Sequence, residues 1–448
     1  MRIWFTEIGE PLPIEQDVRL HRYGQMTRSL AQFGHDVTWW TSNFSHAPKA
    51  FLRAQDSVET VDGVRLRILA GPGYRRNVSV ARFRHQADFA AKFYSRASAE
   101  NPPDLLVTPI PTIETAALAV RYAKERDVPV LVDIRDEWPD DLTNLAPPPL
   151  RPFGRVVLGS FYRRMAYACR NADAIIAVSE RQLHHGLKYA GRPRGSQDAI
   201  FPHGYSAEPL PREKQSAALQ WWRQRGVREE AFVCCFFGRI GKFFDLGTVI
   251  RAAAVLARQF DVQFVLCGDG SSLSRFQRMA AGNPSVLFPG WVDAPKIAAL
   301  MEISDVGLAP YAAAAGSMSL PNKPFEYFSG SLPVVSSIQG ELRSVLESND
   351  CGRTYAADSV EELTASLRGL LLDPSACAEM GRRARRLLEQ EYTAESIFKR
   401  AHHHFLAIGA KERNKNGDHK TRRDETAESR HSPRIPVSSD LKDQIWPR

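Results

Sequence analysis

Short apolar segments alternate with segments of helical periodicity along almost the whole chain, in two successive series. A continuous apolar run such as Phe232–Phe237 (FVCCFF) is typical of a strand that is buried on both faces of a sheet. Strands that alternate with helices build βαβ units, and the strands of such units are parallel. The chain is therefore expected to adopt an α/β fold with parallel sheets.

The two series have similar lengths and are separated by a polar, irregular stretch that begins after Gly204. Strand candidates in the first series are Arg2–Glu7, Asp36–Thr41, Arg65–Ala70, Asp104–Thr108, Val130–Ile134 and Ala174–Val178. Those in the second series are Phe232–Phe237, Gln263–Cys267, Val286–Phe288, Val306–Ala309, Pro333–Ser336 and Gly352–Tyr355. Helical periodicity fills the intervals at about 20–33, 80–98, 113–126, 155–171 and 180–190, and then at about 245–259, 271–281, 294–302, 322–330, 341–347, 359–371 and 375–390. The pattern predicts two Rossmann-like, doubly wound domains.

The predicted organisation has four parts. Residues 1–205 and 206–393 form the two Rossmann-like domains, and an amphipathic helix within 394–410 closes the structure. Residues 411–448 are rich in Lys, Arg, Asn, Asp and Ser with few apolar residues. Such a segment cannot bury enough surface to offset the entropy of ordering it, so it is predicted to be a disordered tail.

The composition limits the classes of partner and the compartment. The 448 residues carry a formal charge of +8 with a pI near 9.2, compatible with phosphorylated substrates or an anionic membrane surface but too diffuse to indicate nucleic acid. The six cysteines lack CxxC spacing, so they are expected to be small buried hydrophobes in a reducing compartment. There is no signal-peptide layout and no run of roughly 18 apolar residues. The protein is therefore expected in the cytoplasm, free or at the inner face of the membrane.

The segment Ser317–Gly330 (SMSLPNKPFEYFSG) lies between two strand candidates. A helix is expected from about Asn322, and residues three apart on a helix share a face, so Lys323 and Glu326 should point into one crevice. Open α/β sheets bind ligands at the carboxyl ends of their strands. Lysine suits a phosphate and glutamate suits a pair of sugar hydroxyls, so a nucleotide sugar fits both. A plain helix start, with Asn322 as its cap and Pro324 in its first turn, explains the same residues.

A glycine-containing turn follows the strand candidate that ends at Phe237. Gly238 and Gly241 flank Arg239 in this turn, and Lys242 leads into the next helix. The N–H groups and the dipole of a helix N-terminus favour an anion, and two cations beside it would bind a diphosphate. A tight strand–helix connection with its charges in water is the alternative.

Other strand ends offer weaker candidates. Gly268 lies in the turn Cys267–Gly270, where a GxG pair is a weak dinucleotide signal and a turn glycine is the simpler explanation. Asp133, Arg135 and Asp136 follow a buried strand, either as site residues or as an internal ion pair. Gly9 lies in the loop after the first strand and would face the same cleft.

Two segments, Arg151–Arg170 and Gly73–Arg96, combine arginines with aromatic and aliphatic residues. Basic amphipathic helices lie on anionic membranes, although a helix with one core face and one solvated face has the same composition. The histidines of His402–His404 point in three directions on a helix and are expected at the surface. No motif for metal, serine-nucleophile or P-loop chemistry is present.

Several of these segments occur together in an order that is itself informative. They are GHDVT from Gly34, DIRDEWP from Asp133, AVSE from Ala177, PHG from Pro202, GRIGK from Gly238, CGDG from Cys267, FPGWV from Phe288, SDVGLAP from Ser304 and LPNKPFEY from Leu320. Over residues 2 to about 408 this sequence resembles the retaining GT-B glycosyltransferases of family 4, most of all the WbuB-type enzymes of bacterial surface polysaccharide synthesis.

The resemblance implies a nucleotide-diphosphate sugar held mainly by the second domain and a saccharide or lipid-linked acceptor facing the first. Arg239 would contact the diphosphate with help from Lys242, and Glu326 would hold ribose hydroxyls. The backbone near Trp291 and Val292 would read the base. The remaining donor-binding candidates are Gly9, Gly238, Gly268, Asn322 and Lys323, and Asp136 joins Arg239, Lys242 and Glu326 as a catalytic candidate. Attack from the front face needs no metal and no cofactor, because cations stabilise the charge on the departing phosphate.

The sequence also departs from the pattern of the family. The first of two glutamates spaced eight apart would fall at Met318, and the usual phosphate lysine would fall at Phe244. Three hypotheses follow: a retaining glycosyltransferase of surface polysaccharide synthesis, a GT-B nucleotide-sugar epimerase, and a catalytically inactive GT-B binding subunit.

Overall fold

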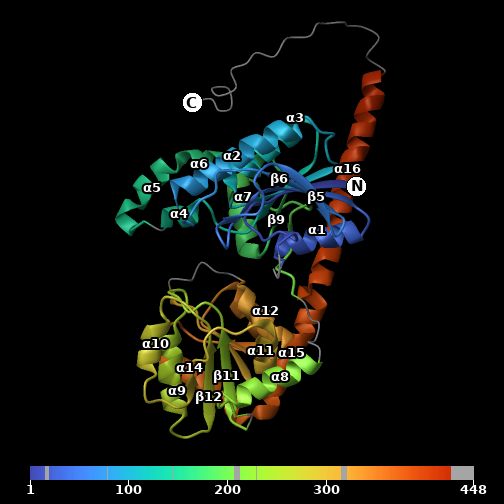
Figure 1. Cartoon of the computed structure of the whole chain (residues 1–448). Coiled ribbons are helices and arrows are strands. Elements are labelled where there is room, and N and C mark those ends of the chain that lie inside the picture. The colour runs from blue at the N-terminus through green and yellow to red at the C-terminus, as the bar shows by residue number, and fades with distance from the viewer. Residues whose placement is uncertain are drawn as a thin grey trace.

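The chain forms two lobes, each built around its own sheet (Figure 1). The computed structural model describes residues 1–15, 20–77, 79–144, 146–205, 212–228, 230–313 and 320–424, without the side chains of 212, 214 and 411–424. One sheet is formed by strands between residues 2 and 200 and the other by strands between residues 232 and 354. The sheets thus lie on either side of the boundary predicted at residue 205, while the domain limits themselves remain predictions.

The sheet of the first lobe has eight strands in the order β10-β9-β8-β7-β1-β2-β6-β5. Its strands are β1 (Arg2–Thr6), β2 (Asp36–Ser42), β5 (Ser57–Val61), β6 (Val64–Leu69), β7 (Leu105–Ile110), β8 (Val130–Ile134), β9 (Ala174–Ala177) and β10 (Ala199–Ile200). Their pairing is parallel except between β5 and β6, and Ile3 lies between Val37 and Leu105 in register. A small antiparallel pair, β3 (Phe44–Ser45) and β4 (Ala50–Phe51), stands outside the sheet.

Both faces of the central part of this sheet are covered, which explains why strands such as β7, β8 and β9 are almost continuously apolar. The helices are α1 (Arg22–Gln32), α2 (Val80–Ala97), α3 (Ile113–Glu125), α4 (Asp140–Asn144), η1 (Pro148–Leu150), α5 (Arg151–Val157), α6 (Gly159–Asn171) and α7 (Glu180–Ala190). Side chains alternate along β1, so that Trp4 packs in the core under α2 and α3 while Ile3 and Phe5 pack in the core that faces α1.

The sheet of the second lobe has six strands in the order β13-β12-β11-β14-β15-β16, all paired in parallel. They are β11 (Phe232–Phe237), β12 (Val262–Cys267), β13 (Val286–Leu287), β14 (Val306–Ala309), β15 (Val334–Ser336) and β16 (Gly352–Thr354). The helices are α8 (Arg212–Arg223), α9 (Leu246–Leu256), α10 (Leu273–Met279), α11 (Ala294–Glu302), α12 (Asn322–Ser329), α13 (Glu341–Ser348), α14 (Val360–Leu372), α15 (Pro374–Leu387) and the π-helical turn η3 (Leu388–Tyr392). Two cores, one on each face, bury this sheet as well.

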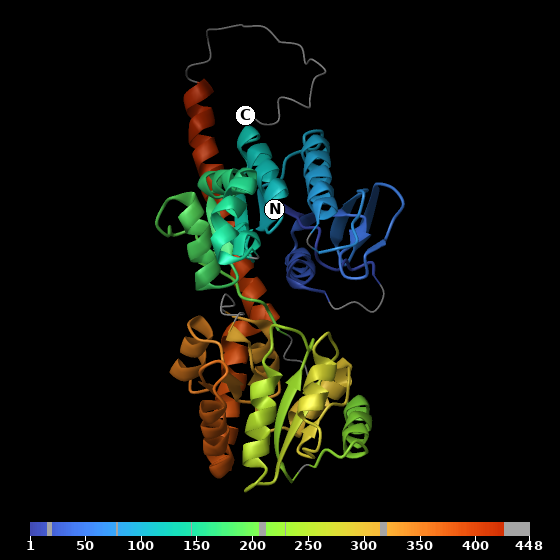
Figure 2. The same cartoon turned by 90° about the vertical axis from the view of Figure 1, so that its left-hand side faces the viewer.

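The chain crosses between the lobes twice, and the two crossings lie side by side. The N–H of Tyr205 donates to the carbonyl of Tyr392 at 3.0 Å, and the N–H of Ala394 donates to the carbonyl of Tyr205 at 3.0 Å. Beyond this point the helix α16 (Ala394–Asp424) leaves the second lobe and runs along the first (Figures 1 and 2). Its side chains Ile397, Phe398, Ala401, Phe405 and Ile408 are buried in the core beside α1.

The predicted disordered tail, 411–448, is corrected in part. Residues 411–424 continue α16, and residues 425–448 lie outside the described part of the chain. The physical reason is that the packed turns up to Ile408 already provide the helix nucleus, which is the unfavourable step of helix formation. Each further residue then gains a backbone hydrogen bond and fixes only its own backbone angles. Lys and Arg, which make up six of the 14 residues of 411–424, are also good helix formers.

The α/β fold with parallel sheets is confirmed, with three local differences. The hairpin β5–β6 is antiparallel, and Gly63 in its turn has φ of +79°, as a tight Asp-Gly hairpin turn requires. Helix α8 occupies a stretch expected to be partly irregular, and it holds Trp222 in the core. The segment expected as one helix from residue 155 is divided at Leu158 into α5 and α6.

The six cysteines are all buried and unbonded, as expected from their spacing. Among the residues that the structure describes, no helix is both long and apolar enough to cross a bilayer.

Candidate functional site

A cavity lined by many of the predicted residues lies at the carboxyl ends of β11 and β12. This strand-end cavity has a volume of about 550 Å³. Its lining consists of Phe237, Gly238, Arg239, Cys267, Gly268, Asp269, Gly270, Trp291, Val292, Ile297, Lys323 and Glu326. Seven of these were predicted donor-binding residues, and they come from four separate turns and helices.

Two glycine turns form the floor of the strand-end cavity by packing directly on each other. The N–H of Ile240 donates to the carbonyl of Asp269 at 2.8 Å, and the N–H of Gly238 donates to the carbonyl of Cys267 at 3.1 Å. Gly268 has φ of +141°, and a Cβ there would overlap the carbonyl oxygen of Gly238. The turn-glycine interpretation of Gly268 is therefore confirmed, because only glycine permits this approach.

Lys323 brings a buried cation to this floor from the first turn of α12. Its ammonium donates to the carbonyl of Phe237 and lies 4.9 Å from the ring centroid of Phe236 and 5.2 Å from that of Phe244. No carboxylate lies within ion-pair distance of it among the described residues, and burial lowers the pKa of Lys323 to about 8. A cation held on a carbonyl and aromatic faces is incompletely neutralised, so it can accept an anionic ligand.

The open side of the strand-end cavity carries a second cation and an aromatic ring. Arg239 is exposed and has no ion-pair partner in the described part of the chain. Trp291 is 74% exposed, whereas the neighbouring Val292 is buried. A flat, exposed ring at the rim of a cavity is a platform on which a base can stack.

Glu326 follows Lys323 by one helical turn, and the two side chains line the same space, as their spacing predicts. Asn322 lines the neighbouring cavity between the lobes. The expected capping role of Asn322 is wrong: α12 begins at this residue, Pro321 occupies the cap position, and no side chain caps the helix. Pro321 occupies the cap position in an extended conformation, so Asn322 is already the first helical residue and its side chain does not act as the cap.

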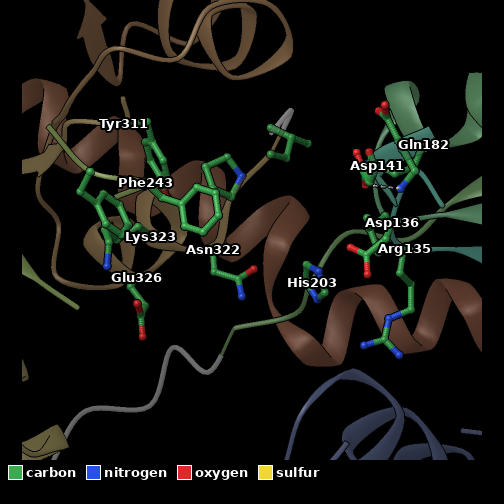
Figure 3. A pocket seen from close by; sticks show the side chains of 15 residues that line it. Arg135, Asp136, Asp141, Gln182, His203, Phe243, Tyr311, Asn322, Lys323 and Glu326 are labelled. Carbon is green, nitrogen blue, oxygen red and sulfur yellow. Dashed lines mark hydrogen bonds between the residues drawn. The ribbon is translucent and has the colours of Figure 1, made fainter. Parts of the chain in front are cut away.

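A second cavity of about 420 Å³ lies between the lobes (Figure 3). Asn322, Lys323 and Glu326 line this interdomain cavity on the side of the second lobe, together with Phe243 and Tyr311. The opposite side comes from the first lobe and consists of Arg135, Asp136, Glu137, Asp141, Val178, Gln182 and His203. The two cavities therefore share Lys323 and Glu326.

The wall contributed by the first lobe is acidic. Solvent reaches the Asp136 carboxylate, but the surrounding walls desolvate it and raise the pKa of Asp136, while Arg135 and Arg82 oppose that effect. Burial also raises the pKa of Asp141, and the charges of Glu137 and Asp136 add to the increase. Carboxylates that are partly withdrawn from water are good hydrogen-bond acceptors for hydroxyl groups.

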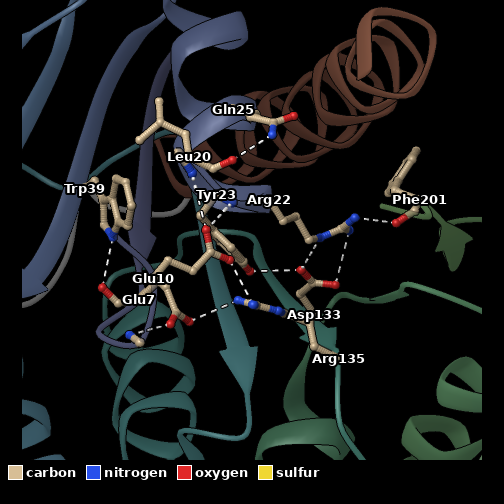
Figure 4. A network of polar contacts seen from close by, with 12 residues as sticks. Glu7, Glu10, Leu20, Arg22, Tyr23, Gln25, Trp39, Asp133, Arg135 and Phe201 are labelled. Carbon is tan, nitrogen blue, oxygen red and sulfur yellow. Dashed lines mark hydrogen bonds and ion pairs between the residues drawn. The ribbon is translucent and has the colours of Figure 1, made fainter. Parts of the chain in front are cut away.

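Behind this wall lies a buried ion network (Figure 4). Arg22 pairs with Asp133 at 3.1 Å, with both side chains about 1% exposed, and the Tyr23 hydroxyl donates to Asp133 at 3.0 Å. Arg135 pairs with Glu10 at 2.8 Å and with Glu7 at 3.2 Å. The internal ion-pair interpretation holds for Asp133, although its partner is Arg22 and not Arg135.

The network also sets the charge of groups near the cavity. Burial raises the pKa of Glu7 to about 7, against the attraction of Arg135. His203 has its pKa lowered to about 3, first by burial and then by Arg22 and Arg135, so it lines the interdomain cavity as a neutral ring. No role had been predicted for His203; its position in the segment that connects the lobes was the available signal.

Two predicted residues are not brought to this site, and one position cannot be placed. Lys242 is exposed, with its ammonium 5.4 Å from the ring of Phe243, and it lines neither cavity. The direction of the turn after Arg239 carries it away. Gly9 also lines neither cavity, and its N–H donates to a carboxylate oxygen of Glu7 at 2.6 Å. Met318 lies outside the described residues.

Two family models match the chain, one for each lobe. The model described as glycosyl transferases group 1 matches residues 231–373, and the model described as glycosyl transferase 4-like domain matches residues 21–199. The chain belongs to the family 4 glycosyltransferases. It is therefore a transferase that acts on sugars. No curated protein matches this glycosyltransferase at a significant level.

Solved structures similar to this glycosyltransferase have its two-lobed GT-B fold. HepE from Anabaena, solved in complex with UDP, has a TM-score of 0.63 and 15% identity over 91% of this chain and 99% of its own. Sucrose-phosphate synthase from Thermosynechococcus elongatus has a TM-score of 0.65 and 15% identity over the same shares. WaaG, a glycosyltransferase involved in lipopolysaccharide biosynthesis, has a TM-score of 0.59 and 16% identity over 89% of this chain and 98% of its own.

Proposed function

We propose that the protein transfers a sugar from a nucleotide-diphosphate sugar in the strand-end cavity to an acceptor in the interdomain cavity. The observation that carries this proposal is that Lys323 and Glu326 line both cavities. A donor and an acceptor bound in the two spaces would meet over one helical turn of α12. Holding both reactants in contact accounts for much of the rate of a transfer reaction.

On the donor side, Arg239 and Lys323 bind the diphosphate, since both line the strand-end cavity and neither has a carboxylate partner within ion-pair distance in the described part of the chain. The Trp291 ring stacks on the base at the rim, beside the backbone of Val292. Glu326 accepts hydrogen bonds from hydroxyl groups of the donor. The complexes of HepE with UDP and with UDP-glucose support a donor of the UDP-sugar class.

On the acceptor side, the carboxylates of Asp136 and Asp141 orient a hydroxyl-rich saccharide, free or lipid-linked. The acceptor hydroxyl attacks the anomeric carbon from the face that the diphosphate leaves, and its proton passes to the departing phosphate oxygen. The new glycosidic bond thus retains the configuration of the donor. Arg239 and Lys323 stabilise the negative charge that grows on the diphosphate, so the scheme needs neither a metal nor a cofactor.

The biological setting is part of the proposal. We place the reaction in the synthesis of a surface polysaccharide, in the cytoplasm at the inner face of the membrane. The involvement of WaaG in lipopolysaccharide biosynthesis supports that setting by analogy of fold. The WbuB-type resemblance of the sequence supports the same setting.

The test uses the purified full chain with a panel of UDP-, GDP- and dTDP-sugars and follows release of the nucleoside diphosphate. We expect turnover with one class of donor, loss of turnover in Arg239→Ala and Glu326→Ala, and melting temperatures close to that of the unsubstituted chain. Conversion of the donor sugar to its epimer without release of the diphosphate would favour the epimerase instead. Unchanged rates in both variants would remove the assignment of the site.

A further inference from the structure

Helix α5 is an apolar element whose large side chains are largely exposed in the part of the chain that the structure describes. None of its residues is buried. Leu150, just before the helix, is 56% exposed, and Phe153, Val156 and Val157 are 70%, 77% and 65% exposed. Helices of soluble proteins turn their apolar stripe towards a core, so four large apolar side chains in water within eight residues indicate a missing partner.

Arginines surround this apolar surface without any acidic residue in the same stretch of sequence. Residues 145–172 contain Arg151, Arg155, Arg163, Arg164 and Arg170 and no Asp or Glu. Arg151, Arg155 and Arg163 are exposed, and the nearest acidic partner of Arg155, Asp140, is 3.5 Å away at the start of α4. A partner that fits must offer both an apolar phase and negative charge.

The start of α2 extends the same surface. Phe83 packs against Phe161 of α6 with ring centroids 5.2 Å apart, which fixes the first turns of α2 beside the α5–α6 junction. In those turns Val80 is 73% exposed and Arg84 is exposed. Figure 1 shows α5 at the outer edge of the first lobe next to α4 and α6. We call the exposed residues Val80, Arg84, Leu150, Arg151, Phe153, Arg155, Val156 and Val157 the α5 surface.

The α5 surface is joined to the wall of the interdomain cavity. Asp141, which lines that cavity, lies in the first turn of helix α4. Helix α5 lies against α4, with the Cβ position of Gly154 only 3.7 Å from the side chain of Thr143. The Thr143 hydroxyl also lies 2.8 Å from the Tyr162 hydroxyl of α6. Whatever binds α5 is therefore held close to the proposed acceptor side.

We propose that the α5 surface docks the protein on a bilayer that contains anionic lipids. Phe153, Val156 and Val157 enter the boundary between headgroups and acyl chains, while the arginines stay at the level of the phosphates. A protein partner would need a dedicated acidic groove, whereas an anionic bilayer presents both required features everywhere. The docking deepens the proposed function, because it places the acceptor wall at the membrane that carries lipid-linked acceptors.

The experiment measures flotation of the full chain with vesicles of phosphatidylcholine alone and of phosphatidylcholine mixed with phosphatidylglycerol. No donor or acceptor is added, so the result is independent of whether transfer occurs. We expect binding only to the anionic vesicles, weakened by salt. The triple variant F153S/V156S/V157S should have a partition constant for the anionic vesicles that is lower by a factor of about ten or more, because each inserted apolar side chain contributes to that constant.

The matched control is V255S/M279S/L372S, which removes three exposed apolar side chains from the second lobe and should bind as the unsubstituted chain does. A Phe153→Trp variant should show a blue shift of its added fluorescence with anionic vesicles only. Absence of flotation, or equal flotation of the two triple variants, would overturn the proposal. Self-association that the α5 variant abolishes, without any vesicle binding, would assign the surface to a second copy of the chain instead.

Discussion

The sharpest prediction concerns Lys323, whose burial is expensive for stability and useful for catalysis. The substitution Lys323→Met keeps a flexible, unbranched side chain of similar length and removes the charge. In the folded protein the ammonium lies among the rings of Phe236, Phe237 and Phe244 and donates to one backbone carbonyl. These rings can accommodate a thioether at least as well as an ammonium.

The effect on stability can be worked out from the pKa. Burial lowers the pKa of Lys323 from 10.5 to about 8, which at about 1.36 kcal/mol per pKa unit is a penalty of about 3 kcal/mol for the charged form. The sign follows from linkage: between pH 8 and 10.5 the unfolded chain binds more protons, so stability rises with pH there, and the full penalty is present below pH 8. Lys323→Met removes this penalty and also removes the cation–π contacts, which contribute less than the penalty costs. The melting temperature should therefore stay equal or rise.

The effect on catalysis should have the opposite sign. A hydrogen-bonding or cationic side chain that contacts the developing negative charge of the leaving group contributes a factor of about 10² to 10³ in kcat, or about 3–4 kcal/mol. Lys323→Met should therefore lose about a hundredfold or more in kcat while the fold becomes no weaker. In kcat/KM the unsubstituted enzyme should lose activity above about pH 8, as the free Lys323 loses its proton, and Lys323→Arg should lack that decline.

The assay is release of the nucleoside diphosphate across a pH series, with thermal unfolding of each variant measured in parallel. Lys399→Met, on the exposed side of α16, is the control and should match the unsubstituted chain in both measurements. Lys242→Met separates the two candidate cations, since Lys242 lines neither cavity. A kcat within threefold of the unsubstituted enzyme in Lys323→Met, with a large loss in Lys242→Met, would refute the reasoning and return the phosphate contact to Lys242.

Three further perturbations test other parts of the structure. Gly238→Ala should reduce kcat at least tenfold, because Gly238 has φ of +149° and an added Cβ would overlap the Lys323 ammonium. Gly241→Ala is its control and should be nearly silent in the same assay, because no atom lies within 4 Å of the added Cβ. Arg22→Met should cost about 3–5 kcal/mol in denaturant unfolding, because it leaves a buried carboxylate unpaired; a loss below 1 kcal/mol would contradict the network. Phe405→Ala should cost about 3–5 kcal/mol in the same measurement, because it removes a large side chain from the core. Ending the chain after residue 410 should leave the melting temperature unchanged, because it keeps every residue of α16 whose side chain the structure shows in the core.

The elements that the sequence predicts well are those whose own residues carry the signal. Strands β8, β11 and β14 and helices α7 and α11 have the predicted bounds, because a buried parallel strand is a continuous apolar run and capping residues stand at the helix starts. Helix α8 was harder to predict because its polar sequence gains its stability from Trp222, which is buried against another element. The pairing of Arg22 with Asp133 joins residues 111 positions apart and leaves no local pattern.

In the candidate site, too, the face of a helix on which a residue lies can be predicted from the sequence, whereas the contacts between distant turns cannot. The spacing of Lys323 and Glu326 correctly predicts a shared face, because helical geometry is local. Arg239 and Lys242 look equivalent in the sequence, yet the turn after Gly238 directs only Arg239 into the strand-end cavity. That choice depends on packing between the two glycine turns, since Ile240 is held by the carbonyl of Asp269.

The departure at Phe244 acquires a physical meaning from this packing. The position where related enzymes would carry a phosphate lysine holds a ring that lies 5.2 Å from the Lys323 ammonium and 4.8 Å from the ring of Tyr311. A lysine at 244 would place two ammonium groups in one desolvated space, where their repulsion would favour loss of a proton from one of them. An aromatic residue instead supports the cation that arrives from α12. We therefore infer that Lys323 on α12 supplies, in the same space, the positive charge that a lysine at position 244 would supply in related enzymes. The double variant Phe244→Lys/Lys323→Met should accordingly recover activity that Lys323→Met alone loses.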